Sequence, residues 1–203
     1  MSKKTEDNSN KKNSIKPIRL SKPRIPPLDK SKWNEDVISQ IKNLQQGPRG
    51  QVPNIFTTLA NHPKLLKRWL VFGRHVTLKS SLPRRDREIL MLRIGWLCYS
   101  EYEFGQHVKI GKSCGISDEE IKMIMEGPDA KGWDPFEAAL LRAVDELHTD
   151  AFISDSIWNI IAERYNKHQL LDLIFTVGQY NLICMALNTL GVQLDGWING
   201  FPE

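Results

Sequence analysis

Residues 81–115 constrain the fold more than any other part of the sequence, because they predict two consecutive helices, the first of them buried. The first helix begins at Pro83, since proline favours the opening position of a helix. Its apolar residues lie on nearly every side, as expected of a helix with no solvent-facing surface; they are Ile89, Leu90, Leu92, Ile94, Trp96 and Leu97. The second helix follows directly, with Ser100 as its expected N-cap. The chain is therefore expected to form around a helical core.

Three polar residues in this stretch are a candidate acid–base group. Glu88 interrupts the apolar helix, while Glu103 and His107 are four residues apart and share one face of the next helix. Two carboxylates and an imidazole can move protons to and from a substrate. A structural alternative is equally open at this point. Ser100 and Glu103 also match a capping box, and an acid such as Glu88 is favoured in the first turns of a helix.

The rest of the sequence favours an all-α, single-domain helical bundle. Helical periodicity or capping patterns occur in residues 28–46, 64–78, 117–127, 135–148, 154–165 and 167–190. Alternating strand patterns, glycine-rich phosphate loops and the residue spacings of zinc sites are absent from the sequence. We therefore expect one helical domain over residues 28–203, without a metal or a cofactor.

Residues 1–27 form a basic, proline-rich extension that is expected to be disordered. The first thirty residues carry nine Lys and Arg and three Asp and Glu, whereas residues 31–203 have a net charge of −2. The basic character therefore belongs to the extension, and the domain has no composition that indicates a specific nucleic-acid partner. Residues 17–28 contain four prolines and are expected to form an extended strap against the domain or a neighbouring subunit.

The three cysteines, Cys98, Cys114 and Cys184, have neither a C-x-x-C spacing nor zinc-ligand spacing. All three lie in apolar helical sequence, which favours reduced, buried thiols and a cytoplasmic location. We expect no disulfide among them. The sequence also shows no uninterrupted apolar stretch of the length that crosses a membrane, and no secretory signal segment, so no membrane partner is expected.

The order and spacing of several residues resemble a known family. The pattern consists of Arg87, Glu88, Leu92, Arg93, Tyr102, Glu103 and His107. In this order they resemble the carboxymuconolactone decarboxylase family, part of the wider AhpD-like superfamily, with Phe104 where the family pattern has tryptophan. The resemblance covers about residues 52–194 and implies an all-α, AhpD-like fold.

The peroxidase branch of that superfamily uses two cysteines, a histidine and an upstream glutamate. When His107 is placed on the family histidine, Ser100 and Glu103 occupy the two cysteine positions and Glu88 occupies the glutamate position. A serine and a carboxylate cannot form a disulfide. The resemblance therefore implies that acid–base residues are kept while the redox dithiol is missing at this site.

The resemblance implies a cofactor-free enzyme that decarboxylates, or moves a proton within, a small carboxylic acid or lactone. His107 is expected to carry the proton, Glu103 to orient it, and Glu88 to serve as a second acid or base. Arg93 or Arg87 is expected to hold a substrate carboxylate. Two alternatives remain: an AhpD-like antioxidant protein that uses Cys98 or Cys114, and a non-catalytic oligomeric binder of small molecules.

Further pocket residues are expected from the same resemblance. Tyr102 belongs to the central motif, and Asn54 and Tyr180 lie in segments similar to the family, although a turn role for Asn54 and a helix–helix contact for Tyr180 fit equally well. His75 is a weaker candidate because none of its sequence neighbours offers a partner. The family and the surplus of apolar helix surface both predict a homo-oligomer, such as a dimer, trimer or hexamer.

Overall fold

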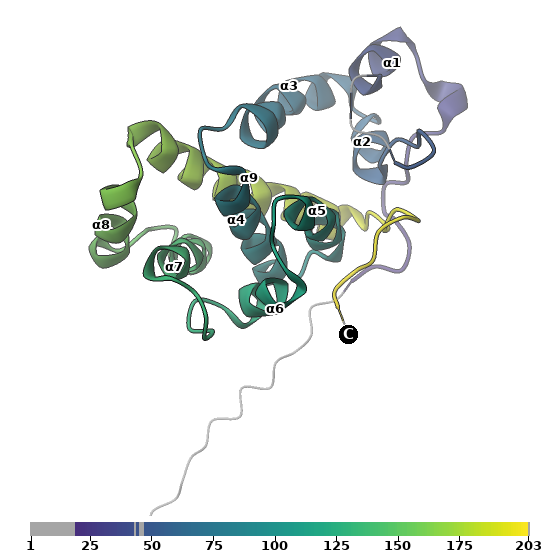
Figure 1. Cartoon of the computed structure of the whole chain (residues 1–203). Helices are drawn as coiled ribbons and strands as arrows, with labels where there is room; N and C mark the ends of the chain where they lie inside the picture. Colours follow the sequence, from purple (N-terminus) through teal and green to yellow (C-terminus); the bar gives the residue numbers. More distant parts are fainter. Residues whose placement is uncertain (1–18, 43, 45–46, 203) are drawn as a thin grey trace, which may run out of the picture.

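The protein is entirely helical over the residues that the computed structural model describes, which are 19–42, 44 and 47–202 (Figure 1). Its elements are η1 (Lys30–Lys32), α1 (Glu35–Ile41), α2 (Asn54–Leu59), α3 (Pro63–Arg74), η2 (His75–Lys79), α4 (Arg84–Leu97), α5 (Glu101–Ser113), α6 (Asp118–Glu126), α7 (Pro135–Thr149), α8 (Asp155–Arg164) and α9 (Lys167–Leu190). The predicted all-α class is confirmed.

Helix α4 is the centre of the bundle, as the sequence predicts (Figure 1). Every residue from Asp86 to Gly95 is buried, because α4 packs against α5, α6, α7 and α9. The chain leaves α4 through Cys98 and a tight connection in which Tyr99 has a φ of 51°. Helix α5 then begins at once after Ser100. The central motif is therefore carried by two helices that are in contact along the core.

The ends of several helices are set by local chemistry that the sequence indicates. The side chain of Asp134 accepts hydrogen bonds at the start of α7, and Asn166 closes a capping box at the start of α9. The predicted helix over residues 64–78 instead divides into α3 and the π-helical turn η2, and α2 was not expected. The helix predicted within residues 28–46 is reduced to η1 and α1.

The strap lies on the domain itself. The amide of Arg24 donates to the carbonyl of Leu190 at 2.8 Å, and the amide of Leu28 donates to the carbonyl of Thr57 at 2.8 Å. Arg24 and Leu28 thus attach the strap to the domain, which is one of the two positions expected for it. Of the extension predicted to be disordered, residues 1–18 lie outside the described residues.

Helix α9 is long and apolar enough, by length and composition, to cross a membrane, with a mean hydropathy of 1.6 in its most apolar window. Gln179 and Asn181 interrupt its apolar residues, so the expectation that the sequence holds no uninterrupted apolar stretch of this length is not overturned. Only 44% of that window is buried, and the remaining face exposes Leu171, Phe175, Leu182 and Met185. Because the core helix of a soluble protein passes the same test, this composition is weak support for a membrane span.

Candidate acid–base site

Glu88, Glu103 and His107 converge in the structure on a single buried cluster between α4 and α5. The Nδ1 atom of His107 lies 2.6 Å from Oε2 of Glu88. On the other side of the ring, Nε2 lies 3.5 Å from Oε1 of Glu103. Both nitrogens of one imidazole therefore face a carboxylate, an arrangement that favours the doubly protonated ring.

The surroundings of the cluster favour the protonated form of His107. The three side chains are almost fully buried, since Glu88 is 2%, His107 6% and Glu103 8% exposed. Burial alone would lower the pKa of His107, but the charge of Glu88 and the hydrogen bonds to Glu103 and Glu88 outweigh it and raise the pKa to about 10. The imidazolium is thus the resting form at neutral pH and can act as a general acid.

The capping alternative for Glu103 is not realised. Ser100 occupies the N-cap of α5, but its side chain caps no backbone amide, and its buried hydroxyl has no hydrogen-bond partner. Glu103 instead faces His107. The sequence analysis gave the orienting role to Glu103, whereas the structure gives the shorter contact to Glu88, so Glu88 is the residue that fixes the ring.

Two hydrogen-bond donors, Arg87 and Tyr180, lie next to the cluster. Arg87 is buried and approaches Glu88 only at 3.8 Å, and its Nε has no partner. The ring of Tyr180, from α9, meets the His107 ring edge-on with centroids 4.9 Å apart. Burial and the charges of Glu103 and Glu88 raise the pKa of Tyr180, so its hydroxyl stays protonated. These donors suit an anionic ligand.

The structure places Arg93 outside this cluster. Its guanidinium pairs with both carboxylate oxygens of Asp145, at 2.7 and 2.9 Å. The remaining nitrogen donates to the carbonyls of Ile124 and Met125 at 2.8 and 3.0 Å. Arg93 therefore joins α4 to α6 and α7 and has little capacity left for a substrate carboxylate. Of the two arginines, Arg87 is the one that lies beside the acid–base cluster.

Tyr102 and Asn54 belong to a second polar cluster, centred on Asp195, which the sequence analysis missed. Three groups donate hydrogen bonds to the Asp195 carboxylate. They are the Tyr102 hydroxyl at 2.6 Å, the backbone amide of Asn54 at 2.9 Å and the side-chain amide of Gln106 at 2.8 Å. Asp195 is only 3% exposed, and burial raises its pKa. This cluster ties α2 and α5 to the C-terminal segment. The one sequence signal for it is an acid among apolar residues near the C-terminus.

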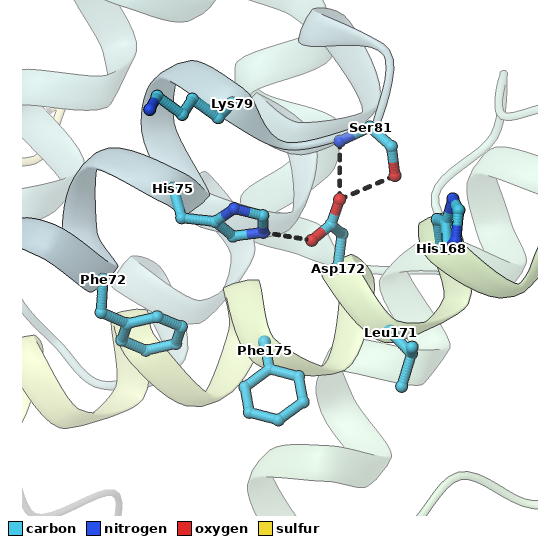
Figure 2. Close-up of a pocket in the computed structure, with 8 residues that line it drawn as sticks. All are labelled: Phe72, His75, Lys79, Ser81, His168, Leu171, Asp172 and Phe175. Atoms are coloured by element: carbon cyan, nitrogen blue, oxygen red, sulfur yellow. Dashed lines mark hydrogen bonds and ion pairs between the residues drawn. The ribbon is translucent and has the colours of Figure 1, made fainter.

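A separate groove of about 430 Å³ lies between η2 and α9 (Figure 2). His75 does have a partner there, contrary to the sequence analysis: its Nε2 lies 2.7 Å from Asp172. Ser81 donates to the same carboxylate through its amide and its hydroxyl, at 2.6 and 2.7 Å. Because the hydroxyl faces Asp172 and not the imidazole, these residues form a structural tie and not an activated serine nucleophile. Exposed Phe72 and Phe175 border the groove (Figure 2).

Among the described residues, no group of three or more His, Cys, Asp or Glu side chains has an arrangement that would hold a metal ion. The acid–base cluster itself is occupied by its own pairing, since each carboxylate faces the imidazole.

Residues 63–146 match the model of the carboxymuconolactone decarboxylase family. This range contains all of α4 and α5 and therefore the three residues of the acid–base cluster. A search among curated proteins found no match to the sequence.

Several solved structures share the fold. The alkylhydroperoxidase AhpD core of a peroxidase-related protein from Ralstonia eutropha is 18% identical, with a TM-score of 0.75 over 86% of this chain and 93% of that one. A peroxidase-related protein from Silicibacter is 16% identical, with a TM-score of 0.67 over 89% and 93%. The debrominase Bmp8, solved with 2,3,4-tribromopyrrole, is 14% identical, with a TM-score of 0.68 over 85% and 91%. At these identities the likeness concerns the fold.

Proposed function

We propose that the chain, which matches the carboxymuconolactone decarboxylase model over residues 63–146 and shares the fold of AhpD-like structures, is an acid–base enzyme that decarboxylates a small carboxylic acid or lactone without a cofactor. The observation that carries the proposal is the buried imidazole of His107 held between two carboxylates. Such an arrangement keeps an acid and a base within reach of one substrate atom.

The proposed reaction begins at a substrate carboxylate next to a carbonyl or lactone group. The bond between the carboxylate and its neighbouring carbon breaks, CO₂ leaves, and the electron pair delocalises into the carbonyl as an enolate. The His107 imidazolium donates its Nε2 proton to that carbon or oxygen and regains a proton from solvent. Glu88 holds the ring through Nδ1, and the charges of both glutamates keep it protonated. Glu103, on the Nε2 side, is the base for a proton moved within the substrate.

The substrate class follows from the donors beside the ring. A carboxylate bound between Arg87 and Tyr180 would supply the hydrogen-bond acceptor that Arg87 Nε lacks. A small anion also suits a cluster whose side chains are less than a tenth exposed, because a large ligand would require the core helices to separate. The proposed substrate is therefore a compact carboxylate with an adjacent carbonyl.

The test is exchange of carbon-bound hydrogen in deuterated water. A panel of small keto acids and lactone carboxylates is incubated with the protein, and deuterium incorporation and CO₂ release are followed by nuclear magnetic resonance. We expect the wild type to label or decarboxylate at least one member and His107→Gln to lose the activity at least about a hundredfold, as removal of a general acid does. His75→Gln is the matched control and should keep full activity, since His75 lies in the other groove.

Two results would count against the proposal. Binding of a panel member without exchange or CO₂ release would make the protein a small-molecule binder. Equal activity in wild type and His107→Gln would remove the acid–base cluster from the chemistry. Tyr180→Phe provides a second readout that does not depend on the folding of His107→Gln, because it removes only the hydroxyl and keeps the ring that packs against His107. It should raise KM for a carboxylate several-fold with little change in kcat.

A further inference from the structure

Two cysteines that are far apart in the sequence meet at the connection between α4 and α5. The Cys98 thiol donates to Oδ1 of Asn181 at 3.1 Å, and the Asn188 side chain donates to the Cys98 carbonyl at 2.9 Å. Asn181, Cys184 and Asn188 occupy one face of α9, at the i, i+3 and i+7 positions. Cys98 is therefore held against α9 by residues on both sides of Cys184.

The surroundings shift the pKa values of the two thiols in opposite directions. The hydrogen bond from Cys184 and the charge of Arg19 lower the pKa of Cys98, against the opposing effect of burial. Arg19 reaches this position because its guanidinium donates to the carbonyls of Cys98 and Tyr99 at 2.9 and 2.8 Å. The hydrogen bond that it donates to Cys98 and its full burial raise the pKa of Cys184. Cys98 is thus the nucleophile of the pair and Cys184 its protected partner.

The two thiols also differ in their exposure to solvent. Cys98 is partly exposed, whereas Cys184 is buried. The Nδ1 atom of His148, from α7, lies 3.9 Å from the Cys98 sulfur and can accept its proton. An exposed thiol with a nearby base and a buried second thiol behind it is the arrangement in which oxidation of the first sulfur is followed by closure onto the second.

We propose that Cys98 and Cys184 form a redox-active dithiol that hydrogen peroxide converts into an intramolecular disulfide. This site is separate from the acid–base cluster and does not rest on the proposed decarboxylation. It also differs from the dithiol that the resemblance describes, because Ser100 and Glu103 occupy those positions. The sequence analysis expected no disulfide, because the cysteines lack a C-x-x-C spacing and Ser100 and Glu103 stand where the family dithiol would be; the proposal departs from that expectation.

The reaction balances with peroxide as the oxidant. The Cys98 thiolate attacks one peroxide oxygen, the O–O bond breaks, and the sulfur becomes a sulfenic acid while the other oxygen leaves as water after taking up a proton. The Cys184 sulfur then attacks the Cys98 sulfur, the S–S bond forms, and the sulfenic oxygen leaves as a second water. The two sulfur atoms supply the two electrons, and an added dithiol reverses the oxidation.

The test uses the full chain treated with stoichiometric hydrogen peroxide, followed by alkylation of the remaining thiols and peptide mass spectrometry. We expect a peptide pair that joins Cys98 to Cys184, with loss of two hydrogen atoms from the intact mass and return to the reduced mass after dithiothreitol. Cys98→Ser and Cys184→Ala should each reduce that species to less than about a tenth of the wild-type level. Cys114→Ser is the matched control, since Cys114 is also partly exposed, and should leave disulfide formation unchanged.

A second readout needs no variant and so does not depend on folding. In the reduced wild type, iodoacetamide should modify Cys98 about tenfold faster than Cys114 at neutral pH, because the pKa of Cys98 is lowered. Oxidation of Cys98 to sulfinic acid without a disulfide, a disulfide that involves Cys114, or equal alkylation of Cys98 and Cys114 would each overturn the proposal.

Discussion

Replacement of His107 by glutamine should cost far more stability than the same replacement of His75. Both histidines pair with a carboxylate at nearly the same distance, 2.6 Å to Glu88 and 2.7 Å to Asp172. The difference lies in burial, since the His107 side chain is 7% exposed and that of His75 is 49% exposed. A buried pair that loses one partner leaves an uncompensated charge, whereas water screens an exposed one.

The magnitude follows from the protonation of His107. The difference between the ordinary pKa of 6.5 and about 10 corresponds to an upper limit of about 5 kcal/mol. Loss of one member of a buried pair typically costs about 3–5 kcal/mol. We therefore expect His107→Gln to lower the free energy of unfolding at pH 6 by about 3–5 kcal/mol, and His75→Gln to lower it by no more than about 1 kcal/mol.

The direction in which the stability difference changes with pH is a second, independent test. The folded pKa of His107 is raised, so its stabilisation is complete below the unfolded pKa of 6.5 and is lost as the pH rises through about 10. Urea unfolding at several pH values between 6 and 10 measures this effect. The difference in stability between wild type and His107→Gln should shrink steadily over that range. Equal losses in the two variants at pH 6, or a difference that grows with pH, would refute the reasoning.

Three further results are expected. Asp195→Ala should destabilise the protein by about 1–3 kcal/mol in urea unfolding, because it leaves the Tyr102 hydroxyl without its acceptor; a stability unchanged from wild type would contradict the clamp role of Asp195. Tyr102→Phe should cost less than Asp195→Ala, and a larger loss would place the main stabilisation elsewhere. Light scattering should give the mass of a homo-oligomer that Phe175→Glu dissociates, since Phe175 belongs to the exposed apolar face of α9; a monomer at all concentrations would exclude this assembly.

Local sequence chemistry predicts most of the fold. The apolar residues on every side of α4 require burial, and the caps at Asp134 and Asn166 mark where α7 and α9 begin. These signals lie within a few residues of the element that they define, so they can be recognised in the sequence alone. The π-helical turn η2 has no such signal, because its wider spacing results from the way that residues 75–79 approach α9.

The acid–base cluster was predictable for the same reason. Glu103 and His107 share a face at helical spacing, and an acid in the apolar α4 can only face another polar group. The partners of Arg93, Asp195 and Cys98 were not predictable, because each pair joins residues separated by more than fifty positions. Such pairs depend on how the helices pack, and no local pattern records them.

The most direct measurement is the titration of the His107 ring by nitrogen-15 nuclear magnetic resonance, with the His107→Gln spectrum to assign its signals. The buried pairing with Glu88 and Glu103 predicts that both ring nitrogens stay protonated at pH 8 and that the ring titrates near a pKa of about 10. A ring that titrates near its ordinary pKa of 6.5, or that is neutral at pH 7, would contradict the assignment of His107 as the general acid.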